Sequence, residues 1–180
     1  MEFETPSGTA GILRDWKDAD FPAFAEMNAD PEVMRYLLKT LTLEEAQTFL
    51  NKIRTLIAEN GWGFWAVEVD GELAGMTGLH APTFEAPFTP CVEIGWRFRK
   101  QFWGRSIAFS AARTALSYGF EKLQLDEIVA FTTQGNIRSQ TLMKRLGMTY
   151  DPRDDFDHPM VEADNPLLRH VLYRKSRLVQ

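Results

Sequence analysis

The chain has 180 residues, 44% of them hydrophobic, which suffices for one domain with a sizeable core. Its single cysteine excludes an internal disulfide framework and a multi-cysteine metal site, and no apolar run approaches the ~20 residues of a transmembrane helix. The net charge of −5 argues against broad attraction to nucleic acid. Because residues 1–6 also lack a signal-peptide pattern, we expect a cytoplasmic protein with one domain over residues 1–180, no metal and no membrane contact.

The first third of the chain predicts one strand and several helices. Residues 10–14 form the first expected strand, residues 18–28 a short amphipathic helix, and Asp30-Pro31 the start of another short helix. A capping box follows at residues 42–45, with Thr at the cap and Glu three positions later. The helix that it opens is expected to end at Asn60-Gly61, because glycine readily adopts the left-handed conformation that closes helices.

The middle of the chain predicts three antiparallel strands. Residues 64–69 and 72–79 flank Asp70-Gly71, which is a strong signal for a two-residue hairpin turn. Residues 81–90 contain three prolines and are expected to form a loop. The third strand covers residues 92–98, where apolar side chains alternate with Glu, Gly and Arg.

The last part of the chain alternates helices and strands. In chain order we expect a helix over 105–120, a strand over 127–133, a helix over 136–146 stopped by Gly147, a short strand over 148–150, an irregular polar segment over 151–166 and a last strand over 168–174. This order of elements predicts a mixed α/β architecture, although periodicity alone does not give its topology.

The run from Gln101 to Ala108 joins an alternating strand to an alanine-rich helix. The first turn of a helix has unpaired N–H groups and the positive end of the helix dipole, so an anion binds there readily. Gly104 and Ser106 are small enough to let a pyrophosphate approach, and Arg99, Lys100 and Arg105 would add positive charge. The glycines match neither the P-loop nor the dinucleotide-binding pattern, and an ordinary strand–loop–helix connection is the alternative interpretation.

This run resembles the acyl-CoA pyrophosphate loop of the GNAT N-acetyltransferases, whose pattern is [QR]-x-x-G-x-[GA]. Here it is Gln101-x-x-Gly104-x-Ser106, with serine where the family usually has Gly or Ala. Trp103-Gly104-Arg105 and Ala108 are similar to the RimJ/RimL subgroup, which acetylates N-termini of ribosomal proteins. The order of elements from residue 10 to residue 174 is also similar to the GNAT fold. The resemblance therefore implies a mostly antiparallel central sheet of about seven strands flanked by helices.

The resemblance also implies acetyl-CoA as the cosubstrate. The residues that it places at the acetyl-CoA site are Trp96, Phe98, Arg99, Gln101, Phe102, Trp103, Gly104, Arg105, Ser106, Ile107, Ala108 and Asn136. The segment Asn136-x-x-Ser139, followed by Lys144-x-x-Gly147-Met148, looks like a second family motif. In that motif the asparagine contacts the pantetheine arm and the serine can protonate the leaving thiolate. Capping of the helix by Asn136 is the structural alternative, and the two roles are compatible.

Glu93 is the first candidate for the base that removes the proton of the attacking amine. The alternation of its strand places it with Gly95 and Arg97 on the face opposite to Val92, Ile94, Trp96 and Phe98. A partly desolvated carboxylate on a central strand acquires a raised pKa, which suits general-base catalysis. An ion pair with Arg97 or another cation is the structural alternative.

Other reactive side chains favour structural roles. The histidines at 80, 158 and 170 have no metal-ligand spacing, although His80 follows a strand and could face an acceptor. Cys91 is a weak candidate for an acyl carrier, and the tryptophans at 62, 65 and 96 are more typical of core packing than of an acceptor wall. The acidic stretch 154–157 and the loop 83–88 could border the amine, but solvated loops are the more ordinary explanation.

These inferences predict direct transfer of an acetyl group from acetyl-CoA to a primary amine, with Glu93 as base and Ser139 as the proton donor to the thiolate. The acceptor is expected to be a protein N-terminus or a small molecule, and the protein a monomer or homodimer. The alternative is a non-catalytic module of the same fold that binds or senses acyl-CoA. Fold resemblance does not decide the acceptor.

Overall fold

The computed structural model describes residues 1–177. The strands are β1 (Glu2–Glu4), β2 (Ala10–Arg14), β3 (Phe64–Val69), β4 (Glu72–His80), β5 (Glu93–Phe98), β6 (Glu127–Thr133), β7 (Thr149–Tyr150), β8 (Phe156–Asp157) and β9 (Arg169–Ser176). The helices are α1 (Phe21–Ala29), α2 (Leu43–Asn60), α3 (Ile107–Glu121) and α4 (Ile137–Arg145). Three short 3-10 turns cover Asp18–Asp20, Lys100–Phe102 and Pro152–Asp154. This is the mixed α/β architecture expected from the order of elements.

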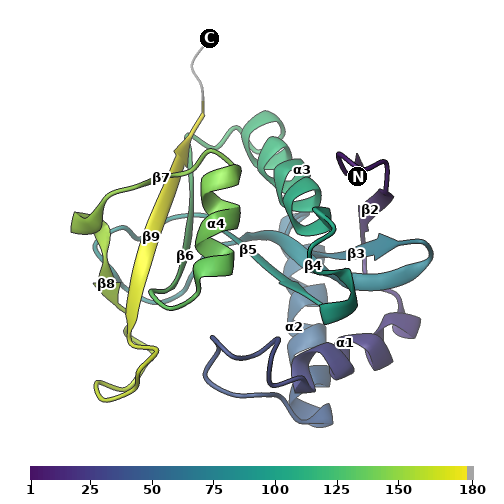
Figure 1. Ribbon diagram of the computed structural model, residues 1–180, viewed down its shortest axis with the longest axis horizontal. Helices are drawn as coiled ribbons and strands as arrows, with labels where there is room; N and C mark the ends of the chain where they lie inside the picture. Colours follow the sequence, from purple (N-terminus) through teal and green to yellow (C-terminus); the bar gives the residue numbers. More distant parts are fainter. Residues whose placement is uncertain (178–180) are drawn as a thin grey trace.

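The strands form one mostly antiparallel sheet in the order β1-β2-β3-β4-β5-β6-β9-β7, with β8 added beside β9. The exception to the antiparallel pairing is β5 beside β6, where the strands are parallel. Glu93 opposite Val129 is the one register pair between these strands in the described structure, and the Val129 N–H donates to the Val92 carbonyl at 2.9 Å. Beyond this point β5 and β6 diverge, so the sheet opens into two halves (Figure 1).

The two faces of the first half-sheet are covered by different helices. Helix α3 packs on one face, where Ile94 and Phe98 of β5 join its buried alanines in the main core. Helices α1 and α2 cover the opposite face and form a second core around Phe24 and Leu50. Figure 1 shows α3 on one side of the sheet and α1 and α2 on the other, with α4 beside the second half-sheet. The alternation predicted for β5 thus sends Glu93 and Arg97 toward the α1–α2 side.

Local signals in the sequence give the expected boundaries for α2 and the central hairpin. Thr42 caps α2 through a complete capping box, and Gly61 ends the helix with φ at +76°. Asp70 and Gly71 both have positive φ, at +52° and +79°, as a two-residue hairpin turn requires.

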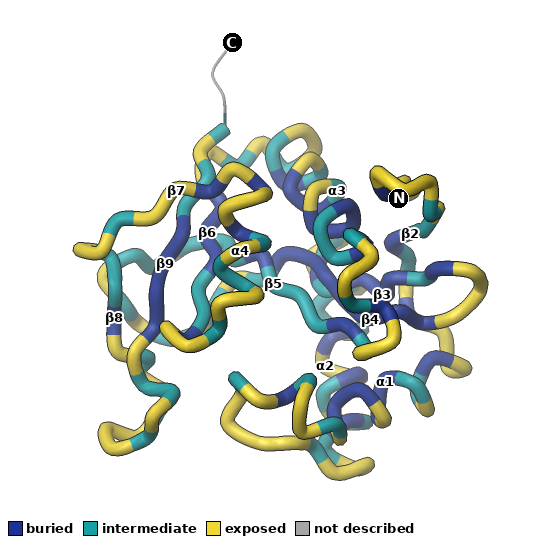
Figure 2. Tube along the Cα trace, in the orientation of Figure 1, coloured by how far each residue is buried: buried dark blue, intermediate teal, exposed yellow. Residues whose placement is uncertain are grey.

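The helix predicted to start at Asp30-Pro31 is wrong, because residues 31–38 form turns. The Asp30 carboxylate accepts the N–H of Glu32 at 2.8 Å, which gives the backbone a local alternative to a helix. Met34 is buried, but Leu37 and Leu38 are exposed, so the segment has no apolar helical face to pack. Figure 2 shows this connection before α2 as largely exposed.

Smaller differences have equally local reasons. Helix α3 begins at Ile107 and not at residue 105, because Ser106 has φ at +58° and cannot continue a right-handed helix backward. Within the described residues the sheet has nine strands, where about seven were expected. The additional strands β1 and β8 are two or three residues long, too short to show a period in the sequence. Strand β8 and a 3-10 turn also lie in the segment 151–166 that was expected to be irregular.

Two features are absent from the described part of the chain. No helix among residues 1–177 combines the length and the apolar character needed to cross a membrane. The same residues contain no group of three or more His, Cys, Asp or Glu side chains arranged to hold a metal ion.

The capping box of α2 gives a direct test of the helix boundary. The Thr42 hydroxyl accepts the Glu45 N–H at 3.2 Å, and the Glu45 carboxylate accepts the Thr42 N–H at 2.9 Å. We expect Thr42→Ala to lower the free energy of unfolding by about 1 kcal/mol, measured by urea denaturation. The control is Thr40→Ala, an exposed threonine outside the helix, which should change it by less than about 0.5 kcal/mol. Equal losses in both variants would contradict the capping role.

Candidate active site

The opening between β5 and β6 is the feature around which the candidate site is built. Glu93 lies at its closed end, where the two strands still pair. The loop from β5 to α3 lies beyond the far end of β5, and the turn from β6 to α4 lies beyond the far end of β6. Where β5 and β6 diverge, their facing edges no longer form hydrogen bonds with each other. The backbone N–H and C=O groups on these edges are therefore available to an extended ligand.

The start of α3 has the geometry of an anion site. The first helical hydrogen bond runs from the Ser110 N–H to the Ser106 carbonyl at 3.0 Å, so the N–H groups of the preceding helical residues have no carbonyl partner within the helix. The Ser106 side chain does not cap these groups. Gly104 has φ at +74° and open space around its Cα, and Ser106 is also left-handed, which turns the loop into a concave backbone surface.

The aromatic residues of the loop hold its backbone in place. Phe102 is buried in the main core, and the Trp103 indole N–H donates to the Phe98 carbonyl at 2.8 Å. Phe98 itself is buried against α3, so its side chain and that of Phe102 cannot contact a ligand. Trp96 is partly buried and packs on the same core. Of these residues expected at the acetyl-CoA site, Phe98 and Phe102 are buried, whereas Trp96 and Trp103 remain partly exposed.

The basic side chains beside the loop differ in whether a carboxylate neutralises their charge. Arg99 binds Glu26 at 2.8 Å, and Lys100 lies 3.2 Å from both Asp30 and Glu32, so their charges are neutralised locally. Arg105 has a single distant partner among the described residues, Asp70 at 3.8 Å. Of the three basic residues expected to add positive charge here, Arg99 and Lys100 are thus paired with carboxylates, whereas Arg105 is nearly unpaired in the described structure.

Two arginines of α4 that the sequence analysis did not single out lie against the loop. The Arg138 guanidinium is 4.8 Å from the Trp103 ring centre, and that of Arg145 is 4.7 Å from the Phe109 ring centre. Arg145 also reaches the Ser106 hydroxyl at 3.5 Å. Neither arginine has a carboxylate partner in the described part of the chain. Their spacing of seven residues places them on one helix face, and this was the signal available in the sequence.

Glu93 occupies a position where its carboxyl group is desolvated but unpaired. The residue is half-buried and lies opposite His80 on β4 and Val129 on β6. No hydrogen bond or ion pair to its carboxylate exists among the described residues, so the alternative of an ion pair with Arg97 is not observed. Burial raises the pKa of Glu93 to about 8. A carboxylate with this pKa is able to accept a proton near neutral pH.

Asn136 and Ser139 lie together at the start of α4. The Asn136 side chain accepts the Ser139 N–H at 3.2 Å and donates to the Thr132 hydroxyl at 3.0 Å, so it caps the helix as the structural alternative predicted. The half-buried Ser139 hydroxyl has no hydrogen-bond partner in the described structure and is available to a ligand.

Tyr36 is a site residue that the sequence analysis missed. A Cβ atom on Gly135 would lie 3.6 Å from Tyr36 Cε1, so the connection between α1 and α2 reaches the turn that precedes α4. This connection thereby borders the opening between the two half-sheets. No local pattern marks Tyr36, because its neighbour in space is about 100 positions later in the chain.

The other reactive residues mostly have structural surroundings. Cys91 has a pKa raised to about 11, chiefly by burial and then by Glu93, so its thiol stays protonated and is a poor acyl carrier. Burial lowers the pKa of His158 to about 4, and its ring packs among phenylalanines. In the acidic stretch, Asp154 binds Arg174 at 2.7 Å and Asp157 binds Arg169 at 3.2 Å.

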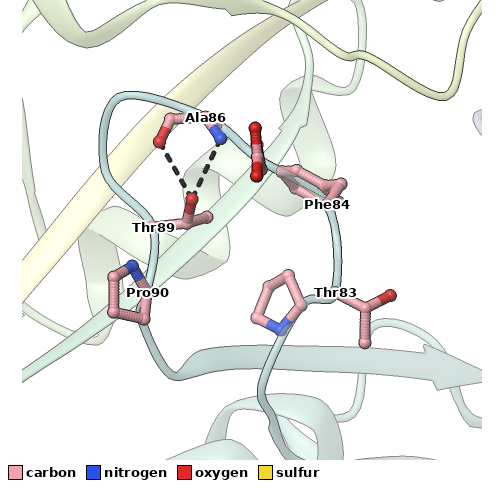
Figure 3. Close-up of a pocket in the computed structure, with 7 residues that line it drawn as sticks. Thr83, Phe84, Ala86, Thr89 and Pro90 are labelled. Atoms are coloured by element: carbon pink, nitrogen blue, oxygen red, sulfur yellow. Dashed lines mark hydrogen bonds between the residues drawn. The ribbon is translucent and has the colours of Figure 1, made fainter.

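Two cavities lie on the acceptor side of the sheet or near it. One, of about 430 Å³, is an open hollow lined by residues 82–86, 89 and 90 (Figure 3). Beside it the Thr89 hydroxyl accepts the Ala86 N–H and donates to the Ala86 carbonyl, both at 2.9 Å. The hollow lies within a single loop and has no titratable group other than Glu85 in its lining. Phe84 and Phe88 of this loop pack against Phe131.

The second cavity, of about 640 Å³, lies between α2, the segment before it and β5. Its lining is Met34, Leu37, Leu38, Lys39, Leu41, Glu44, Glu45, Thr48, Phe49, Lys52 and Arg97. Arg97 belongs to the same strand face as Glu93, so this cavity lies on the Glu93 side of the sheet.

Comparison with known proteins agrees with this arrangement. The model of the acetyltransferase (GNAT) domain matches residues 12–149. The FsC-acetyl coenzyme A-N(2)-transacetylase of Aspergillus fumigatus is 33% identical over 164 residues, which are 85% of this chain and 69% of that protein. YnaD of Bacillus subtilis, an uncharacterized N-acetyltransferase, is 30% identical over 139 residues, 76% of this chain and 78% of that protein.

Solved structures share the fold at lower identity. A GNAT-family acetyltransferase from Bacillus anthracis superposes with a TM-score of 0.77 at 23% identity, covering 98% of each chain. RimJ of Mycobacterium smegmatis, solved in complex with CoA-disulfide, gives a TM-score of 0.77 at 18% identity over 98% of this chain and 86% of that one. The family model and the related sequences show that the chain belongs to the GNAT acetyltransferases and is an acetyl-CoA-dependent enzyme.

Proposed function

We propose that this protein transfers the acetyl group of acetyl-CoA to a primary amine in a ternary complex, and that the amine is a protein N-terminus, as in the RimJ/RimL subgroup, or a small molecule. The observation that carries the proposal is an unpaired, desolvated carboxylate at the closed end of the β5–β6 opening, with an anion-binding helix start at the far end of β5. We further propose that residues 1–180 form one cytoplasmic domain that works as a monomer or a homodimer.

The residues of the loop fit a pyrophosphate. Gly104 leaves the backbone open, and the unpaired N–H groups at the start of α3 point their positive dipole toward the bound group. Arg105, Arg138 and Arg145 supply positive charge without a close carboxylate partner of their own in the described structure. The pantetheine arm then follows the open edge of β5 toward Glu93, past Asn136.

The chemical step requires two proton transfers. The amine nitrogen attacks the thioester carbonyl carbon, the C–S bond breaks, and the products are an amide and a thiol. Glu93 accepts the proton that the amine loses, directly or through water. The Ser139 hydroxyl passes a proton to the leaving thiolate while it takes one from solvent, and Glu93 later releases its proton to solvent, so that the step balances. An α-amine with a pKa near 8 needs about 1 kcal/mol for deprotonation at pH 7, whereas a lysine needs roughly 4–5 kcal/mol. A carboxylate of pKa about 8 is therefore best matched to an α-amine or another weakly basic amine.

A non-catalytic acyl-CoA-binding module is the second candidate. It would need the helix start and the open strand edge but would gain nothing from an unpaired, desolvated carboxylate, which destabilises the fold. Release of free thiol from acetyl-CoA in the presence of an amine pool separates the two candidates.

Gly104→Glu tests the acetyl-CoA site. We expect the native protein to bind acetyl-CoA with micromolar affinity in calorimetry and the variant to lose binding, because a carboxylate would occupy the place of the pyrophosphate. Gly61→Glu is the matched control, since Gly61 also has positive φ, +76°, and open space around it but ends α2. Loss of binding in both variants would indicate strain, and no binding by the native protein would contradict the proposal.

Glu93→Gln tests the base. We expect kcat/KM for an α-amine to fall by roughly 10²-fold or more. In the native enzyme the rate should rise with pH to a plateau above about 8, where Glu93 is ionised. The variant should retain only the titration of the amine itself, so the difference between the two profiles isolates Glu93. Identical profiles, with rates within about threefold, would exclude Glu93 as the base.

The same substitution should change stability in a pH-dependent way. The pKa of Glu93 rises from an ordinary 4.5 to about 8 on folding, so between these values the folded protein holds a proton that the unfolded chain has lost. Native stability should therefore decrease as pH rises through this window, and Glu93→Gln should be the more stable protein at pH 8. Urea denaturation at pH 5 and pH 8 measures the difference, with the exposed Glu59→Gln as control for loss of charge. A Glu93→Gln effect that does not vary with pH would show that the carboxylate is solvated.

A further inference from the structure

Arg97 is a cation on the Glu93 side of the sheet and forms no ion pair with any described residue. It lies on β5 and lines the 640 Å³ cavity next to α2. Among the described residues its one hydrogen-bond partner is the Asn28 side-chain oxygen, and its guanidinium is 5.6 Å from the Phe49 ring centre. No other N–H group of the guanidinium has a hydrogen-bond partner among residues 1–177, and the side chain forms part of the cavity wall. Burial lowers the pKa of Arg97 to about 10, so the group stays charged at neutral pH.

The cavity around Arg97 has a mostly apolar lining. The charged side chains that also line it do not neutralise the guanidinium. The apolar side chains are Met34, Leu37, Leu38, Leu41 and Phe49. Lys39 is paired with Glu45, which cancels both charges. Exposed Lys52 and exposed Glu44 also line the cavity, and neither forms an ion pair with a described residue. With Arg97 the cavity therefore carries a net positive charge of about one, although the whole chain is negative.

An apolar surface separates Arg97 from Glu93 on the same strand face. The residue between them on this face is Gly95, and a Cβ atom there would lie 3.0 Å from Phe64 Cε1, so the Phe64 ring covers the glycine. The Phe64 ring also stacks on His80, which is opposite Glu93. Four residues of strand separate the two Cα atoms by about 13 Å. An acceptor that reaches both charged groups must therefore be elongated and apolar in its middle.

We propose that Arg97 anchors the acceptor, and that the acceptor is an elongated primary amine with a carboxylate several bonds from its nitrogen. The amine would lie at Glu93, an apolar segment would lie along Phe64, and the carboxylate would bind the free guanidinium N–H groups beside Phe49. This inference rests on the proposed acetyl transfer and specifies its acceptor. A free α-amino acid, with one carbon between amine and carboxylate, is too short to reach both ends.

The test compares acceptors that differ only in charge at the far end. We would measure kcat/KM with saturating acetyl-CoA for glycyl-aminohexanoate and glycyl-aminooctanoate, whose α-amines are of the weakly basic kind matched to Glu93, each against its neutral carboxamide. The amine pKa is similar within each pair, so the contribution of the base cancels. A charge-assisted bond to Arg97 should favour each acid by roughly tenfold or more, mainly through KM. Equal rates for acid and amide would overturn the proposal even without a variant.

Variants at Arg97 test whether this residue causes the preference for acid acceptors over amide acceptors. Arg97→Gln should bring acid and amide within about twofold of each other while the dissociation constant of acetyl-CoA stays unchanged. Arg97→Lys should keep part of the preference, because lysine retains the positive charge but cannot form the bidentate hydrogen bonds of a guanidinium with a carboxylate. Arg113→Gln, an exposed arginine on α3 across the sheet, is the control and should keep the full preference.

The outcomes also separate this inference from the proposed function. If Arg97→Gln lowered the rates for acid and amide equally, Arg97 would only support the fold through Asn28, and the inference would be wrong. If no amine in the series released thiol from acetyl-CoA although calorimetry showed binding, acetyl transfer itself would be in question. Thiol release with the amides but no acid preference would leave acetyl transfer intact and exclude the anchor.

Discussion

The divergence of β5 and β6 is the constraint on which the rest of this structure depends. Parallel strands ordinarily pair along their length, yet here one register pair at Glu93 is followed by separation. The separation places unpaired backbone groups, an anion-binding helix start and a desolvated carboxylate along one opening. Helices α3 and α4 pack beside the two diverging strands, and the buried residues Met143 and Leu146 of the α4 region belong to the same core as α3. The opening is thus supported by packing and does not weaken the core around it.

Two ionisable groups on the acceptor face of β5 are held apart at a cost in stability. Glu93 and Arg97 have opposite charges and share one strand face, but Gly95 and the Phe64 ring lie between them. Each is desolvated without a charged partner, as the raised pKa of Glu93 and the lowered pKa of Arg97 show. If the two residues were two positions apart on this strand face, their side chains could form an ion pair. Neither group would then be available to bind a substrate. Their separation is therefore what keeps them reactive toward a third group.

The sequence predicted those features that depend on neighbours in the chain. The capping box at Thr42, the Asp70-Gly71 turn and the alternation of β5 are local, and all three are confirmed. The sequence did not predict the turns over residues 31–38, where Asx hydrogen bonds and missing apolar periodicity prevent a helix. It also missed the positions of Arg138, Arg145 and Tyr36, because contacts across the opening join segments far apart in the chain. Ion pairs that neutralise Arg99 and Lys100 were hidden for the same reason.

The net charge of the chain differs in sign from the electrostatic potential near parts of the candidate site. The protein has a formal charge of −5, which by itself favours a cationic acceptor. Two carboxylates of the acidic stretch that could attract such an acceptor are paired, since Asp154 and Asp157 bind arginines of β9. Cations without a carboxylate partner among the described residues lie at two places, Arg138 and Arg145 beside the start of α3 and Arg97 in the cavity beside α2. Charges within a few ångströms outweigh distant ones that salt screens beyond about 8–10 Å. The same fold can therefore be acidic overall and still attract anionic groups at these two places, while Glu93 at the closed end of the opening receives a proton.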